Sequence, residues 1–300
     1  MTWVIAGMMF AFFSSVTMLI NQKFQINGHL ISGMRGLGVA LLFVPVLFFM
    51  RAPTSPLFWG LIVAQGLLSS FFNARLYASS AKFGAGATSR ISAMAVVAGV
   101  AAWWAVDFNR LEELLADFHV FAGIMGSLAV IVVSFFFMSR SSGQNSRAGL
   151  IYMLPAVAVL AVMMIVRKEI MLESEFLNGI AYYCAFSIGM SGFWNLAYFA
   201  WKNSAGGLVR EITAKHVMIG GSAMICASAC TIICGNVAVY YAPNPAYVNA
   251  LTLTSPIFVM AYNRLKGISD PVSIPAMAAT LAGIAALLYF CDIPLPHPIP

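Results

Sequence analysis

The chain has 300 residues, of which 61% are hydrophobic and 9% are charged, and its formal net charge is +6. Soluble domains contain about 45–50% apolar and about 25% charged residues, so this composition excludes an ordinary soluble fold and predicts an integral membrane protein. Most of the 16 basic residues are scattered through short connections, so we expect no nucleic-acid partner.

Ten strongly apolar segments follow one another along the chain. Each holds close to the roughly 20 residues that cross about 30 Å of hydrocarbon. In chain order, we predict membrane spans at 2–20, 30–50, 57–79, 86–106, 119–138, 149–166, 177–200, 216–239, 246–264 and 273–291. The predicted fold is an all-α membrane protein with ten transmembrane helices in a lipid bilayer. The connections leave no room for a nucleotide-binding module, so we expect no ATP-binding subunit.

A polar stretch at 139–148 divides the ten segments into two sets of five. Because five is odd, the second set would enter the membrane from the opposite side, and the two halves would be inverted copies. Inverted repeats that meet at the membrane midplane are typical of secondary transporters, because the halves can rock about a shared site. We predict a first five-helix repeat at 1–140, a second at 148–292 and a short proline-rich tail at 293–300.

An internal comparison supports two related halves. A shift of the chain against itself by 163 residues superimposes, without a gap, Asn73 on Asn236, Tyr77 on Tyr240, Ala87 on Ala250, Ser92 on Ser255 and Asp107 on Asp270. The Asn-x-x-x-Tyr pair lies near the end of segments three and eight, and the aspartate follows segments four and nine. The placement favours a shared ancestor for the two halves.

These residues carry a resemblance to a known family. Arg35 lies early in the second segment within Ser-Gly-Met-Arg-Gly-Leu, and the third segment contains Phe-Phe-Asn-Ala-Arg-Leu-Tyr. Pro256 lies in Thr-Ser-Pro-Ile-Phe in the ninth segment, Asp270 follows at a position where glutamate is usual, and Asp107 has the matching place in the first half. The chain resembles a ten-helix, EamA-type member of the drug/metabolite transporter superfamily.

The resemblance implies a central cavity and rocking between inward-open and outward-open states, with Pro256, Asp107 and Asp270 as gating or repeat-related residues. Its substrates include amino acids, other small metabolites, nucleotide sugars and drugs, so the fold alone does not identify the substrate. One departure is the fourth segment, where the matching proline is absent around Ala93 and Met94. That departure argues against symmetrical gating.

Polar residues within the spans are the candidates for substrate binding. Gln65, Ser69, Asn73 and Tyr77 are spaced by four and therefore share one helical face. We expect this face to line a cavity, with Asn73 and Tyr77 as ligands and Asn236 and Tyr240 as their counterparts through the repeat. The alternative is that these side chains make hydrogen bonds that only hold helices together; both interpretations stay open.

Arg35 and Arg75 also lie within apolar segments. A buried guanidinium needs an acceptor, and the acidic residues all lie in connections or at segment ends, so a substrate carboxylate or phosphate is a candidate partner for each. The alternative is that these side chains extend to the membrane interface or bind backbone carbonyls.

The lack of an acidic residue inside the spans disfavours proton-coupled export of cationic drugs. Aromatic residues leave that alternative open, because ring faces bind cations without a carboxylate. Trp194 and Asn195, near the middle of the seventh segment, are the candidates for such a site. The expected function is a secondary transporter, an exporter or facilitator, of a small organic solute such as an amino acid or related carboxylate; the alternative is export of cationic or apolar aromatic compounds.

A membrane-embedded enzyme is a remote alternative. Its chemistry would need paired carboxylates, clustered histidines or a nucleophile beside a base, and the four histidines are isolated in the sequence. We therefore expect no enzymatic activity, no catalytic residue, no cofactor and no metal. We expect a monomer that spans the bacterial inner (plasma) membrane several times.

Basic residues bear on the membrane orientation. Connections after odd-numbered segments contain ten, against four after even-numbered ones, namely Arg51, Arg110, Arg167 and Lys168. This bias favours external termini, whereas the family resemblance suggests internal ones. Orientation and transport direction stay open at the level of sequence.

Overall fold

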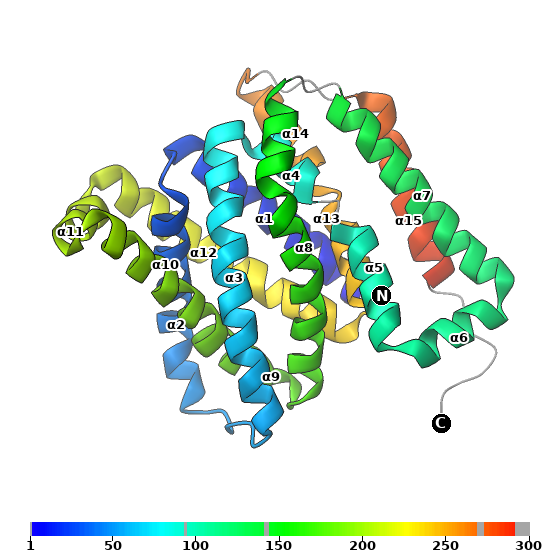
Figure 1. Cartoon of the computed structure of the whole chain (residues 1–300), viewed down its shortest axis with the longest axis horizontal. Coiled ribbons are helices and arrows are strands. Elements are labelled where there is room, and N and C mark those ends of the chain that lie inside the picture. Colours follow the sequence, from blue (N-terminus) through cyan, green and yellow to red (C-terminus); the bar gives the residue numbers. More distant parts are fainter. Residues whose placement is uncertain (1, 93–94, 141–143, 269–272, 292–300) are drawn as a thin grey trace.

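The computed structural model describes the whole chain except residues 1, 93–94, 141–143, 269–272 and 292–300, and its described residues contain helices and no strand (Figure 1). The elements are α1 (Thr2–Phe24), α2 (Gly28–Leu47), α3 (Pro56–Phe83), α4 (Ala85–Ser92), α5 (Ala95–Val106), α6 (Phe108–Ala116), α7 (Phe118–Arg140), α8 (Gln144–Leu172), α9 (Phe176–Tyr182), the π-helix η1 (Tyr183–Ser187), α10 (Ile188–Asn203), α11 (Ala205–Thr213), α12 (Lys215–Tyr241), α13 (Pro245–Thr252), α14 (Ser255–Leu265) and α15 (Ile274–Cys291). The predicted all-α class is confirmed.

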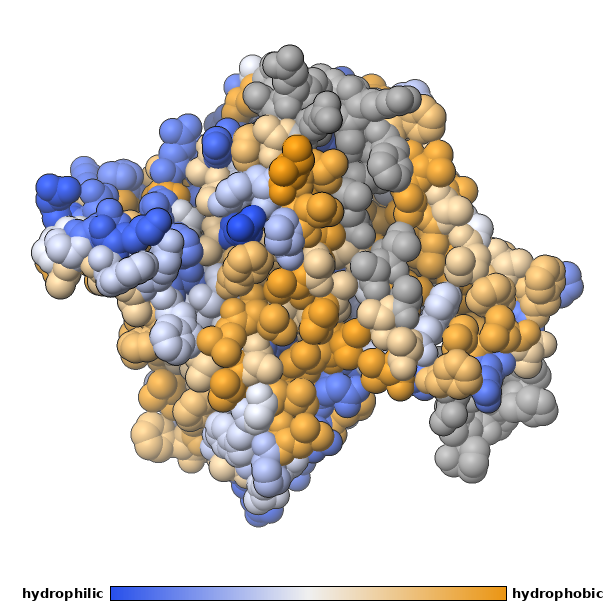
Figure 2. Space-filling model, viewed as in Figure 1, coloured by the Kyte–Doolittle hydropathy of each residue, from blue (hydrophilic) through white to orange (hydrophobic). Residues whose placement is uncertain are grey.

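Five of the described helices are long and apolar enough to cross a membrane: α1, α2, α3, α8 and α12. Large apolar residues within the helices are exposed on the outside of the bundle, including Leu41, which is 70% exposed, and Ile151, which is 67% exposed. Figure 2 shows hydrophobic surface over much of the bundle and hydrophilic residues gathered on α11. In water such a surface would be unstable, so the chain is an integral membrane protein.

Each of the ten predicted apolar segments corresponds to one helix or to a run of consecutive helices, although the second was predicted to end at 50 and α2 ends at Leu47. The fourth corresponds to α4 and α5, the seventh to the continuous run α9, η1 and α10, and the ninth to α13 and α14. α7 and α15 contain shorter apolar stretches, at Phe118–Ser134 and Ile274–Phe290. The predicted departure at Ala93 and Met94 lies outside the described residues.

Two other boundary predictions are wrong. The predicted polar connection at 139–148 is helical where it is described, because α7 continues to Arg140 and α8 begins at Gln144. The sixth span was predicted to end at 166, but α8 continues to Leu172. The prediction ended at the first charged residues, and it did not foresee that Arg167 and Lys168 have partners inside the bundle.

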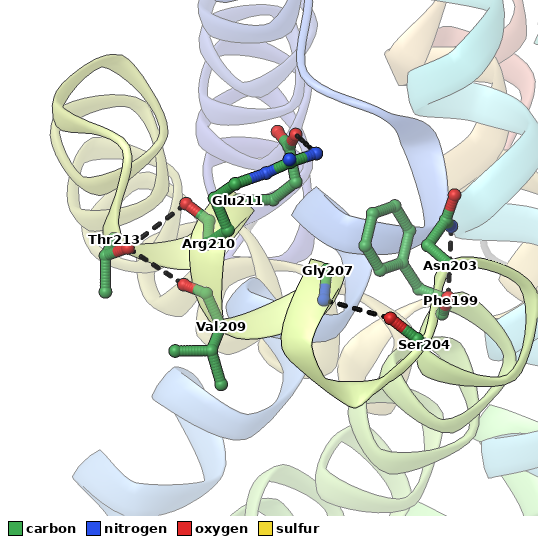
Figure 3. A network of polar contacts seen from close by, with 8 residues as sticks. All are labelled: Phe199, Asn203, Ser204, Gly207, Val209, Arg210, Glu211 and Thr213. Atoms are coloured by element: carbon green, nitrogen blue, oxygen red, sulfur yellow. Dashed lines mark hydrogen bonds and ion pairs between the residues drawn. The ribbon is translucent and has the colours of Figure 1, made fainter.

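The connection between α10 and α12 was predicted as a loop and instead forms the helix α11 (Figure 3). Ser204 has a positive φ of 64° and accepts a hydrogen bond from the backbone N–H of Gly207 at 3.2 Å, so it caps the new helix. Arg210 and Glu211 form an exposed ion pair at 3.8 Å. α11 has no buried residue, and in Figure 1 it lies at the edge of the bundle opposite α7 and α15.

Glycines allow close antiparallel packing of α2 on α10. Gly33 lies beside Leu196, whereas Gly189, earlier in the chain, lies beside Ala40, so the two helices run in opposite directions. At the crossing, a Cβ on Gly36 would lie 2.5 Å from the Cα of Gly192. Small residues at such crossings let membrane helices pack backbone to backbone.

Three other helix pairs are also antiparallel. α1 packs on α12, with Phe24 beside Gly220 and Phe10 beside Gly235. α7 packs on α15, with Gly123 beside Phe290. α3 packs on α8. Ser55, the N-cap of α3, donates to Glu173 just after α8 at 2.7 Å, whereas Arg75 near the end of α3 donates to the carbonyl of Tyr152 early in α8 at 2.7 Å, so these two helices also run in opposite directions. The α2–α10, α1–α12 and α3–α8 pairs form the frame around the cavity described next.

Candidate functional site: a central cavity with two arginines

A cavity of about 100 Å³ lies between the helices of the frame. Its walls come from α1, α2, α3, α8, η1, α10, α12 and the α13–α14 break, and therefore from both of the predicted halves.

Arg35 on α2 lies in this cavity and is only 6% exposed. Its Nε donates to Ser228 Oγ at 2.9 Å, and its guanidinium lies 5.8 Å from the ring centroid of Tyr77. Among the described residues its two terminal nitrogens have no hydrogen-bond acceptor. One edge of the guanidinium is therefore fixed by the protein, and the other is available to a ligand.

Arg167 on α8 also lies in the cavity and is 7% exposed, although it was not among the predicted site residues. Its Nε donates to Asn236 Oδ1, and its Nη2 donates to Ile232 O at 3.0 Å. The guanidinium lies 5.2 Å from the ring centroid of Tyr183. It also lies against Gly235, where a Cβ would be 2.9 Å from both terminal nitrogens.

A signal for Arg167 was present in the sequence. The cavity-facing residues of α8 are Leu160, Met163, Met164 and Arg167, which follow the i, i+3, i+4, i+7 spacing of one helical face. Extending that apolar face by one turn would have placed Arg167 inside the bundle. Arg167 was counted instead as a residue of the connection after the sixth segment, so it was not predicted as a site residue.

The polar face predicted on α3 does line the cavity. Gln65, Ser69, Asn73 and Tyr77 are all buried and all contribute to its wall. Gln65 Nε2 donates to the hydroxyl of Tyr183 at 3.0 Å, while Gln65 Oε1 and Ser69 Oγ have no hydrogen-bond partner among the residues that the structure describes. Buried polar atoms normally have partners, so these are candidates for ligand contacts.

Irregular backbone borders the cavity in two places. Tyr183 begins the π-helix η1, and π-helical turns are frequent at functional sites. On the other side, α13 ends at Thr252 and α14 begins at Ser255 with Pro256 in its first turn. Thr252 and Ser255 line the cavity, so the predicted proline creates the break without facing the cavity itself.

Several predicted site residues lie elsewhere. Arg75 donates to the backbone carbonyl of Tyr152 at 2.7 Å, as the alternative interpretation expected. Trp194 is 47% exposed on the outside of α10. Asn195 is buried but connects helices: its Nδ2 donates to Ser32 Oγ at 3.1 Å, and also contacts Ser70. None of these three lines the cavity.

The residues predicted through the repeat differ in their positions. Asn236 is fully buried and accepts a hydrogen bond from Arg167, so it holds a side chain of the cavity wall in place. Tyr240 does not line the cavity and packs on Phe176 with ring centroids 4.6 Å apart. Asp107 lies between α5 and α6, away from the cavity wall. Asp270 lies outside the described residues.

The electrostatics of the cavity are one-sided. Two guanidinium groups line it, and no aspartate or glutamate is among the described residues of its wall.

In comparisons with known proteins, no protein-family model and no curated sequence matches the chain. Functional assignment therefore depends on the geometry and charge of the cavity.

Proposed function

We propose that the protein is a secondary transporter that carries a small organic solute with a carboxylate group, an amino acid or more favourably a related carboxylate without an ammonium group, by alternating access. The observation that carries this proposal is the pair of buried arginines in one cavity whose described wall has no carboxylate.

Placing an uncompensated cation inside a membrane protein costs several kcal/mol in real proteins, because the charge loses its hydration. Ser228 and the Tyr77 ring compensate Arg35 only in part, since neither carries a negative charge. An anionic substrate would supply the missing charge and could accept two hydrogen bonds from one guanidinium. An organic cation would be repelled by both arginines, and Trp194 lies outside the cavity, so the alternative of cation export is disfavoured.

The proposal includes ten membrane spans arranged as two inverted five-helix repeats. Exchanging the halves turns α1 into α8 and α12 into α3, so the α1–α12 pair becomes the α8–α3 pair. The same exchange maps the pairs α2–α10 and α7–α15 onto themselves. All four pairs are packed and antiparallel, which is the arrangement that an in-plane two-fold axis requires.

Membership of the EamA-type drug/metabolite transporters is part of the same proposal. The break between α13 and α14 supports a transport role, because discontinuous helices commonly form substrate sites in secondary transporters. We propose that the protein acts as a monomeric exporter or facilitator in the bacterial inner membrane.

The test is counterflow in proteoliposomes. Vesicles preloaded with unlabelled amino acids or other carboxylates should accumulate labelled external substrate transiently, as an alternating-access carrier does. Arg35→Gln should abolish the signal, whereas Arg75→Gln, which removes the same charge outside the cavity, should retain it. Absence of counterflow for every anion, or equal loss in both variants, would contradict the proposal.

A further inference from the structure

The two arginines of the cavity are fixed at separate points along one helix. Arg35 is bound to Ser228 on α12, and Arg167 is bound to Ile232 and Asn236 on the same helix. With a rise of 1.5 Å per residue, these partners lie roughly 6 Å and 12 Å from Ser228 along the axis. The guanidinium groups therefore form two cationic points rather than one.

Each of the two guanidinium groups has N–H donors that are not bonded to the described residues. The two terminal nitrogens of Arg35, and Nη1 of Arg167, have no acceptor among the described residues. Thr231 on α12, between the two anchoring points in sequence, also lines the cavity. Each guanidinium can thus donate to a separate anionic group at the roughly 2.8 Å typical of charge-assisted hydrogen bonds.

A ligand with one negative charge can neutralise only one of the two guanidinium groups. A monocarboxylate would pair with one arginine and leave the other buried without a counter-charge, and that residual charge is costly. A zwitterion adds an ammonium group, for which the described wall offers no carboxylate. A ligand with an anionic group at each end matches both points.

We propose that the substrate is a dianion, namely an aliphatic dicarboxylate, with one carboxylate on Arg35 and the other on Arg167. This inference rests on the proposed transport of organic anions through the same cavity, and it specifies their class. It also gives Arg167 a substrate contact, with Gly235 and Asn236 as the residues that position it.

The experiment measures equilibrium binding to the full-length protein in detergent by calorimetry, with glutarate and pentanoate as probes of equal length and different charge. Inorganic phosphate serves as a third probe, because its charges sit on one group. Glutarate should bind about 10- to 100-fold more tightly than pentanoate or phosphate, which is the contribution of one further charge-assisted pair.

Single substitutions at either arginine should remove this preference. Arg35→Gln and Arg167→Gln should each weaken glutarate binding about 10- to 100-fold, to the level of pentanoate. Arg75→Gln should leave both affinities unchanged. Arg35→Lys and Arg167→Lys keep the charge and should keep most of the preference, and they carry the test if a glutamine variant fails to fold.

The outcomes separate the two proposals. If pentanoate or phosphate binds as tightly as glutarate, or if only one arginine affects glutarate, the site holds a single anionic group; the dianion inference is then wrong and anion transport stands. If lysine at either position abolishes the preference as glutamine does, charge pairing is not its origin and the inference also fails. If the native protein binds no carboxylate, the proposed function itself is wrong.

Discussion

Replacing Gly192 by alanine should force α2 and α10 apart. A Cβ at Gly192 would lie 2.5 Å from the backbone nitrogen of Leu37, which is 0.9 Å (3.4 − 2.5) inside the shortest ordinary contact of 3.4 Å. The opposing atoms belong to the backbone, so no change of rotamer relieves the overlap. A separation of this size forfeits about a quarter to a half of each dispersion contact across the crossing.

Overpacking of this kind typically costs about 1–3 kcal/mol. At about 2 kcal/mol, we expect the melting temperature of the detergent-solubilised protein to fall by roughly 4 °C, measured by scanning fluorimetry. Gly36→Ala should have a similar effect, because its Cβ meets the same crossing from the other helix.

Gly126→Ala is the matched control. Gly126 lies on α7, and a Cβ added there would have no neighbouring atom within 4 Å, so alanine at this position should be neutral or stabilise the helix by up to about 1 kcal/mol. If Gly192→Ala melts at the same temperature as Gly126→Ala, the close crossing of α2 and α10 is not present in the folded protein and the reasoning is refuted.

Three further outcomes are expected. Lys168→Met removes the ammonium that donates to the carbonyls of Val239, Tyr240 and Ala242 at 2.7–3.0 Å. The free energy of unfolding should fall by about 3 kcal/mol, measured as a lower melting temperature. Lys202→Met, at an exposed position, should leave the melting temperature unchanged. Gly235→Ala should displace the Arg167 guanidinium and weaken glutarate binding about 10-fold, measured by calorimetry, since one charge-assisted bond is lost; unchanged affinity would show that Arg167 is not held at Gly235. Finally, three of the basic residues counted in the connections are buried: Arg90, one of the ten after odd-numbered segments, and Arg167 and Lys168, two of the four after even-numbered ones. Without them the count is nine against two, which still favours external termini. A periplasmic-active phosphatase fused after the last residue should therefore be active and a fused fluorescent protein dark, and the reverse result would indicate internal termini.

Much of the secondary structure could be predicted from the sequence. Long apolar segments cannot cross hydrocarbon unless their backbone groups are paired, and the helix satisfies them within the segment. The positions of the helices therefore followed from hydropathy, and the spacing of Gln65, Ser69, Asn73 and Tyr77 identified the face of α3 that meets the cavity. The helical period is a local property, so it needed no knowledge of neighbouring helices.

The roles of the arginines could not be assigned in the same way. Arg35 and Arg75 are both charged residues in apolar helices, and the helical spacing indicated only that Arg75 points away from the face of Asn73. In the structure, Tyr152 on α8 supplies a carbonyl to Arg75, whereas Ser228 on α12 leaves the terminal nitrogens of Arg35 facing the cavity. Which acceptor a guanidinium meets depends on residues far away in the chain.

The sequence by itself determined that this is a helical membrane protein and where its apolar segments lie, because both depend on the local balance of apolar and charged residues. Only the tertiary structure decided which partners hold Arg167 inside the bundle. Its burial depends on Asn236 and Ile232 and on the absence of a side chain at Gly235. The same packing brings Arg167 and Arg35 into one cavity, so the charge of the site is a property of how α2, α8 and α12 meet.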